Sequence, residues 1–133
     1  MLNKENNLMN YTGIIIEESL KDKNVLKEIH ITTTEVEQVT EEHKTPWIKQ
    51  WTLHTFEVEE SKAEDFAKIL SKALETEHKW YADYKNAEFH YIVFANHVFK
   101  VNRKNHQQYE DAKKYGLSLG IPEYQLDFTP SIM

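Results

Sequence analysis

The stretch WYADYKNAEFHYIVFANHVFKVNR, residues 80–103, decides the fold class of this chain. It is rich in the aromatic and β-branched residues that are typical of strands, and polar breaks at Asn86-Ala87 and Asn96-His97 divide it. Asparagine tolerates the positive φ angles that tight hairpin turns require. The stretch therefore predicts a meander of three antiparallel strands over residues 80–85, 88–95 and 98–102.

Both faces of this meander are predicted to be apolar. Four large apolar residues share one face: Ile92, Phe94, Phe99 and Val101. The other face carries a mostly apolar set: Phe89, Tyr91, Val93, Val98 and Lys100. Because a sheet that is apolar on both faces needs two covers, we expect helices on one side and a second protomer or a loop on the other. The chain is therefore expected to form a homo-oligomer.

Further strands precede and follow the meander. The consecutive isoleucines of residues 14–16 predict a central strand over 11–16 that is buried on both faces. Segments rich in threonine, valine and aromatic residues predict strands over 28–39 and 47–59. The first either leaves the core at Glu35 and Glu37 or has a bulge that resets its register, and the second has a bend or bulge near His54 and Thr55. Alternation of apolar and polar residues predicts a last strand over 124–128.

Two helices are predicted from capping signals and apolar spacing. Ser61 and Glu64 form a capping box for a helix over 61–77, and Asn105 caps a second helix that ends at Gly120. Gly116 lies on the inner face of this second helix and suggests a close approach to the sheet. The elements predict an α+β fold, an antiparallel sheet with two helices packed on one face, in the ferredoxin-like neighbourhood. One domain is expected over residues 11–130, after a disordered N-terminal lead over 1–10.

Composition limits the compartment and the partners. The chain has 133 residues and no cysteine, which excludes disulfides and thiolate metal sites. No apolar run approaches the length of a membrane span, so we expect a soluble, cytoplasmic protein without a membrane partner. The net charge is -6, and residues 35–65 hold nine acidic residues against three lysines. Such a chain repels phosphate backbones, so nucleic acid is not an expected partner.

Four segments together resemble a known family. They are GIIIEESL (13–20), TPWIKQWTLHTFEVEE (45–60), WYADYKN (80–86) and YGLSLGIPEYQLDF (115–128). The combination is similar to a family of small, uncharacterised bacterial and archaeal proteins, and the likeness covers Tyr11 to Phe128. The resemblance implies a self-contained soluble domain. It carries over no activity, cofactor or catalytic residue.

One pair in the meander could carry chemistry. With a turn at Asn86-Ala87, Asp83 lies directly opposite His90, and Tyr81 is a neighbour on the same face. A carboxylate that orients a histidine is the usual arrangement of a general base. The alternative is a structural hydrogen bond between the two side chains. Burial of His90 away from any cavity would argue against catalysis.

A second set of residues suggests binding. These side chains could line a ligand groove or a partner surface, or else pack in the core: Trp47, Trp51, His54, Trp80, Tyr84 and Tyr91. The chain has no glycine-rich phosphate loop, no G-x-S-x-G elbow and no H-E-x-x-H spacing, so we expect no cofactor and no metal site. The first hypothesis is a non-enzymatic ligand-binding or protein-interaction module. A small cofactor-free enzyme that uses His90, Asp83 and Tyr81 is the alternative.

Overall fold

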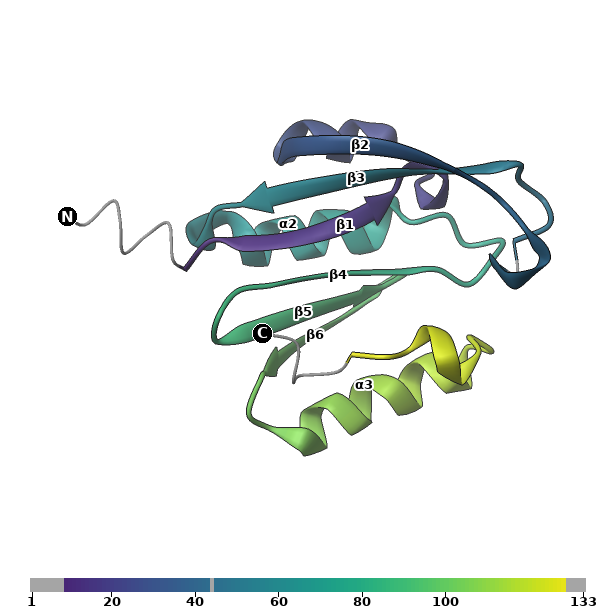
Figure 1. Cartoon of the computed structure of the whole chain (residues 1–133). Coiled ribbons are helices and arrows are strands. Elements are labelled where there is room, and N and C mark those ends of the chain that lie inside the picture. Colours follow the sequence, from purple (N-terminus) through teal and green to yellow (C-terminus); the bar gives the residue numbers. More distant parts are fainter. Residues whose placement is uncertain (1–8, 44, 129–133) are drawn as a thin grey trace.

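The computed structural model describes residues 9–43 and 45–128, and these form a six-stranded antiparallel sheet with two main helices (Figure 1). The strands stand in the order β2-β3-β1-β4-β5-β6. Their bounds are β1 (Tyr11–Ile16), β2 (His30–Gln38), β3 (Gln50–Val58), β4 (Tyr81–Lys85), β5 (Phe89–Phe94) and β6 (His97–Asn102). The helices are α2 (Glu60–Ala73) and α3 (His106–Ser118), with short 3-10 turns η1 (Glu17–Ser19), η2 (Lys23–Glu28), η3 (Glu41–His43) and η4 (Glu123–Gln125). The predicted α+β class is confirmed, while most of the predicted lead over 1–10 and the end of the predicted domain lie outside the described residues.

Strand β1 lies at the centre of the sheet, as its isoleucine run predicts. It pairs with β3 over six residues and with β4 over three. Gly13 stands at the β1–β4 contact, where a Cβ atom would lie 2.4 Å from the carbonyl oxygen of Asp83. Glycine therefore lets the two strands approach closely. The prediction that β1 is buried on both faces is wrong, since Tyr11 and Ile15 are buried on one face while Thr12 and Ile14 are exposed on the other.

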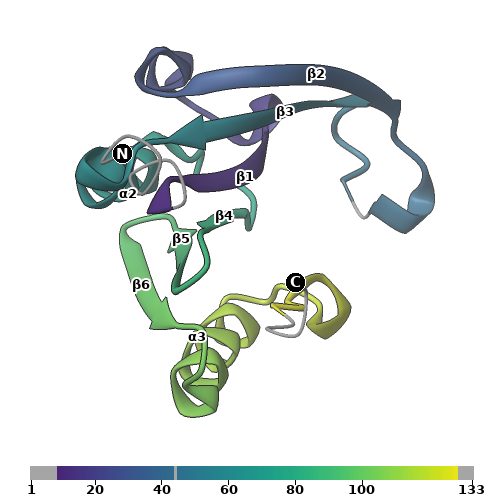
Figure 2. The same cartoon turned by 60° about the vertical axis from the view of Figure 1, so that its left-hand side comes forward.

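The two helices cover opposite faces of the sheet, where the sequence predicted one face for both. Helix α2 packs with Tyr84, Tyr91 and Val93, whereas α3 packs with Ile92 and Phe94. Figure 2 shows α2 beside β1 and α3 beyond β6 on the other side of the meander. The reason is the alternation along β5, because both of its faces are apolar and each needs its own cover. Helix α3 thus takes the place for which a second protomer or a loop was expected, and the homo-oligomer stays a prediction.

The first turn of the meander falls one residue later than predicted and the second falls one residue earlier. Each strand pairing is therefore shifted by two residues from the predicted register. Strands β4 and β5 pair Lys85 with His90, because the Asn86 side chain accepts hydrogen bonds from the backbone N–H groups of Glu88 and Phe89. The β5–β6 turn centres on Ala95 and Asn96, and Asn96 has φ 62°. A shift of two residues keeps every side chain on its predicted face. Of the two alternatives for the strand over 28–39, β2 shows both, since its register shifts between Ile31 and Thr33 and its residues from Thr32 to Gln38 are exposed.

The helix ends confirm one predicted cap and correct another. The Asn105 side chain caps α3 by accepting from the backbone N–H of Gln108 at 3.0 Å, but α2 begins at Glu60 and Ser61 makes no cap. The predicted strand over 124–128 is wrong, since η4 and an irregular segment follow α3 there. Its buried Leu126 lies against Gly116, so the close approach of that glycine is to this segment and not to the sheet.

Candidate functional site

An apolar cavity of about 640 Å³ opens on the sheet face that α2 leaves uncovered. Its floor is formed by Ile14 and Ile16 of β1 and Leu53 of β3. The loop between β2 and β3 forms one wall, and Ile121 and Pro122 of the segment after α3 form another. We call this cavity the tryptophan pocket because Trp47, Trp51 and Trp80 line it, and these are the three tryptophans of the chain.

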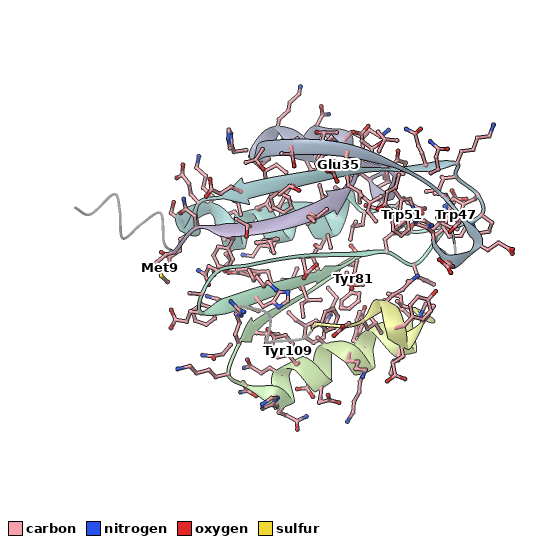
Figure 3. The ribbon with its side chains drawn as sticks, viewed as in Figure 1. Met9, Glu35, Trp47, Trp51, Tyr81 and Tyr109 are labelled. Carbon is pink, nitrogen blue, oxygen red and sulfur yellow. The ribbon has the colours of Figure 1, made fainter. Side chains whose placement is uncertain are left out.

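Three indole rings form the aromatic wall of the tryptophan pocket. Trp80 meets Trp47 at 6.2 Å between ring centroids and Trp51 at 6.3 Å, with interplanar angles of 79° and 63°. Figure 3 shows Trp47 and Trp51 close together beside the end of the sheet, with Tyr81 nearer the segment after α3. Trp47 is 44% exposed, whereas Trp80 is buried. The wall therefore runs from the interior to the surface.

Polar atoms behind the rings hold this wall in place. The indole N–H of Trp51 donates to Oγ1 of Thr45 at 3.0 Å, and that of Trp80 donates to Oε2 of Glu75 at 2.6 Å. The same Glu75 oxygen lies 2.8 Å from Nδ1 of His78, whose ring stacks on Trp47 at 3.7 Å between centroids. Burial raises the pKa of Glu75, but the hydrogen bonds from His78 and Trp80 outweigh it and leave that pKa below its ordinary value. The two bonded indole groups thus present rings, and not N–H donors, to the tryptophan pocket.

Asp83 is the charged residue nearest the floor of the pocket. It pairs with Ile14 across the β1–β4 contact, and its side chain is 38% exposed. One of its oxygens, Oδ2, lies 2.6 Å from Nε2 of His90. The predicted Asp83–His90 interaction therefore forms, although the two residues are diagonal neighbours because Asp83 pairs with Ile92.

His90 is enclosed behind Asp83. Its other nitrogen, Nδ1, lies 2.9 Å from the hydroxyl of Tyr109 on α3, and the residue is only 2% exposed. Burial raises the pKa of Tyr109, and a hydrogen bond from Arg103 opposes that rise. His90 is not among the residues that line either described cavity. It can orient Asp83, but its ring does not reach the tryptophan pocket.

Tyr81 contributes an aromatic ring to the pocket and keeps its hydroxyl elsewhere. That hydroxyl donates to the backbone carbonyl of Gln125 in the segment after α3. Burial, followed by the charge of Asp83, raises the pKa of Tyr81 well above its ordinary value. A phenol that is bonded to a carbonyl and holds its proton this firmly is not placed to exchange a proton with a ligand.

The structure divides the predicted site residues between the two faces of the sheet. Five of them line the tryptophan pocket: Trp47, Trp51, Trp80, Tyr81 and Asp83. Tyr84 and Tyr91 lie in the core beneath α2, where the Tyr84 hydroxyl donates to the Ala63 carbonyl at 2.7 Å. For these two, the core-packing alternative holds.

His54 also lies away from the pocket, on the α2 side of the sheet opposite Ile15. Its Nδ1 is 2.8 Å from Oγ1 of Thr34, and its Nε2 is 2.7 Å from Oε1 of Glu17. These bonds tie the turn after β1 to β3 and to the edge strand β2. Within residues 9–43 and 45–128, no group of three or more histidine or acidic residues is placed to hold a metal ion.

The floor and the second wall of the pocket were missed by the sequence analysis. The signal for the floor was the isoleucine run, whose outer members, Ile14 and Ile16, were assigned to a buried strand. Ile121 and Pro122 gave no signal, because they reach the pocket only through the path of the segment after α3.

A second cavity, of about 780 Å³, lies between α3 and the segment over 123–128. Four of its nine lining residues are charged, and an ion pair of 3.1 Å between Lys113 and Glu123 forms part of it. Such a groove suits water better than an apolar ligand, so the tryptophan pocket is the stronger binding candidate.

Comparison of the chain with protein-family models, with curated proteins and with solved structures gave no match. The resemblance to the small bacterial and archaeal family therefore stays a prediction. In the part of the chain that the structure describes, neither helix has the length and apolar character needed to cross a bilayer.

Proposed function

We propose that this protein is a non-enzymatic ligand-binding module whose tryptophan pocket takes a small, mostly apolar molecule. The observation that carries the proposal is an apolar cavity of about 640 Å³ walled by the three tryptophans. Ligand sites in proteins are typically concave, lined by apolar and aromatic side chains, and on the order of 300–1,000 Å³. The bonds that hold Trp51 and Trp80 also support binding, because a wall already in place loses little conformational entropy when a ligand arrives.

The acid–base alternative receives less support from the same geometry. A general base must come within hydrogen-bond reach of a proton on the substrate. His90 is enclosed by Asp83 and Tyr109, and the Tyr81 hydroxyl is bonded to a backbone carbonyl. Of the three residues in this set, only Asp83 offers an unbonded polar atom to the pocket, which suits the binding of a ligand better than its conversion.

A neutral apolar dye tests the proposal directly. N-phenyl-1-naphthylamine fluoresces when it leaves water, and we expect it to bind one site per chain and to quench the tryptophan emission. All three tryptophans line the pocket, so their emission reports on this site.

A matched pair of variants locates the dye. Ile14→Gln makes the floor polar, while Val36→Gln makes the same kind of change on β2, outside the pocket lining. The two residues are 53% and 55% exposed, so both variants are expected to fold. We expect Ile14→Gln to weaken the dye at least about tenfold and Val36→Gln to leave it unchanged. Equal affinity in both variants, or no binding by the wild-type chain, would refute the proposed function.

A further inference from the structure

The charges around the tryptophan pocket are arranged by depth. Two charged residues at the rim, Glu77 and Lys79, are both exposed and have opposite signs. Asp83 lies further in, next to the isoleucine floor. Among the described lining residues, the inner charge is therefore a single carboxylate, while the rim charges offset each other.

The partners of Asp83 leave it able to meet a second charge. His90 engages Oδ2, while Oδ1 makes no hydrogen bond with the described part of the chain. A carboxylate accepts only, so Nε2 of His90 must be the donor in this bond. The Tyr109 hydroxyl lies 2.9 Å from Nδ1 of His90, so both ring nitrogens of His90 are engaged. With His90 held on both sides, Oδ1 of Asp83 is the carboxylate oxygen that remains for a ligand.

The tryptophan rings add a second feature that favours positive charge. Indole is the best aromatic partner for a cation, and desolvation strengthens the attraction. Trp80 meets Trp47 and Trp51 at steep angles, so the rings form the sides of a box and not a flat stack. His78 covers one face of Trp47 at 3.7 Å, and the exposed fraction of Trp47 leaves the rest of that ring open.

We infer that the ligand of the tryptophan pocket is an organic cation, a quaternary or trimethylated ammonium, held by the three indole rings with Asp83 as its counter-ion. This inference rests on the proposed function and names the class of ligand. A primary ammonium has three N–H donors that each need an acceptor inside the pocket. The indole N–H groups of Trp51 and Trp80 are donors that are already bonded, so they offer a ligand no acceptor. A methylated ammonium needs no acceptor and spreads its charge over methyl groups that pack on the rings.

His90 acts as a positioning residue in this arrangement. It fixes the direction of the Asp83 carboxylate and does not contact the ligand. Tyr109 in turn fixes the His90 ring, so a residue of α3 acts on the pocket through His90 and Asp83 without lining it.

Two probes of the same shape test the inference. Choline carries a trimethylammonium group, and 3,3-dimethylbutan-1-ol has the same outline with a carbon atom in place of the charged nitrogen. Both can be titrated into the full chain by tryptophan fluorescence and by calorimetry. We expect choline to bind at least about tenfold more tightly than the neutral alcohol. Ethanolamine, which lacks the methyl groups, should bind more weakly than choline.

Two variants assign the preference to Asp83. Asp83→Asn should reduce the preference for choline to less than about twofold while the alcohol binds as before. Asp65→Asn makes the same change of charge on the exposed side of α2, outside the pocket lining, and should keep the preference. If Asp83→Asn does not fold, the comparison of choline, the alcohol and ethanolamine on the wild-type chain still decides whether the pocket prefers a methylated cation.

The outcomes separate this inference from the proposed function. Equal binding of choline and the alcohol, or a preference that survives in Asp83→Asn, overturns the cation assignment and leaves the apolar pocket in place. The cation assignment also falls if the naphthylamine dye binds and choline does not. If the dye, choline and the alcohol all fail to bind, both the assignment and the proposed function are wrong.

Discussion

Replacement of Gly13 by alanine should destabilise the fold strongly, although strand propensity alone predicts the opposite. Alanine in place of a strand glycine ordinarily gains about 0.5–1 kcal/mol, because glycine loses more conformational freedom on folding. In this protein the added Cβ would lie 2.4 Å from the Asp83 carbonyl oxygen and 2.7 Å from the Tyr84 Cβ. Ordinary contacts begin near 3.4 Å, so β1 and β4 would have to separate by about 1 Å.

The size of the effect follows from which atoms must move. Overpacking typically costs about 1–3 kcal/mol, and the upper end applies when backbone atoms meet, because they adjust less than the end of a side chain. The β1–β4 ladder has only three paired residues, so its hydrogen bonds cannot redistribute the strain. We expect a loss of about 3 kcal/mol in the free energy of unfolding, and a fall in Tm of about 10–15 °C for a domain of this size.

Thermal and urea unfolding followed by circular dichroism measure this effect, and two other glycines serve as controls. Gly116→Ala meets the flexible methyl groups of Leu126 and should cost less than about 1 kcal/mol. Gly120→Ala has open space but a φ of 93°, so it should cost about 1 kcal/mol from backbone strain alone. A Gly13→Ala protein as stable as the wild type would show that the two strands are not packed as closely as described.

Three further predictions concern titrating groups and a turn. The hydrogen bond from His54 lowers the pKa of Glu17, so this carboxylate stabilises the fold above pH 4.5 and loses that contribution as the pH falls. Urea unfolding of Glu17→Gln at pH 7 and pH 3 should therefore show a smaller loss on acidification than the wild type. Burial, with the Tyr91 hydroxyl nearby, raises the pKa of Tyr11 to about 12, so the stability that it contributes is complete below pH 10 and is lost as the pH rises. Ultraviolet titration should show one tyrosine fewer ionising near pH 12 in Tyr11→Phe, and a signal already complete at pH 10.5 would contradict this. Asn96 has φ 62°, so Asn96→Val should lower the free energy of unfolding by about 1–2 kcal/mol while Asn96→Gly stays within about 0.5 kcal/mol, both measured in urea.

The meander was predictable because local alternation determines which face a side chain occupies. The faces of Ile92 and Phe94 were correct even though both registers were shifted by two, since a two-residue shift preserves the alternation. The turn positions were not predictable to the residue. The Asn86 side chain bonds to two backbone N–H groups and so selects a longer turn than the asparagine signal alone implies.

Other features depend on contacts between distant segments. The alternating residues 124–128 are typical of a strand, but no strand of residues 9–43 and 45–128 pairs with them, and Leu126 instead fills the space left by Gly116 of α3. The same long-range path brings Ile121 and Pro122 to the tryptophan pocket. The Asp83–His90 interaction was predicted as a direct pair and exists as a diagonal one, so the residues were identified correctly and the geometry was not.

The order of elements along the chain has a consequence for synthesis on the ribosome. Strands β4 to β6 are complete at residue 102, but the helix that covers their second face begins only at His106. Until residues 106–128 have left the ribosome and α3 has folded, the side chains of Ile92, Phe94 and Val101 lack the cover that this helix provides. A nascent meander exposes this apolar face to chaperones or other chains during this interval, whereas α3 covers the face in the finished protein. Changes that weaken α3 should therefore reduce the yield of soluble protein in cells more than they reduce the stability of the purified domain.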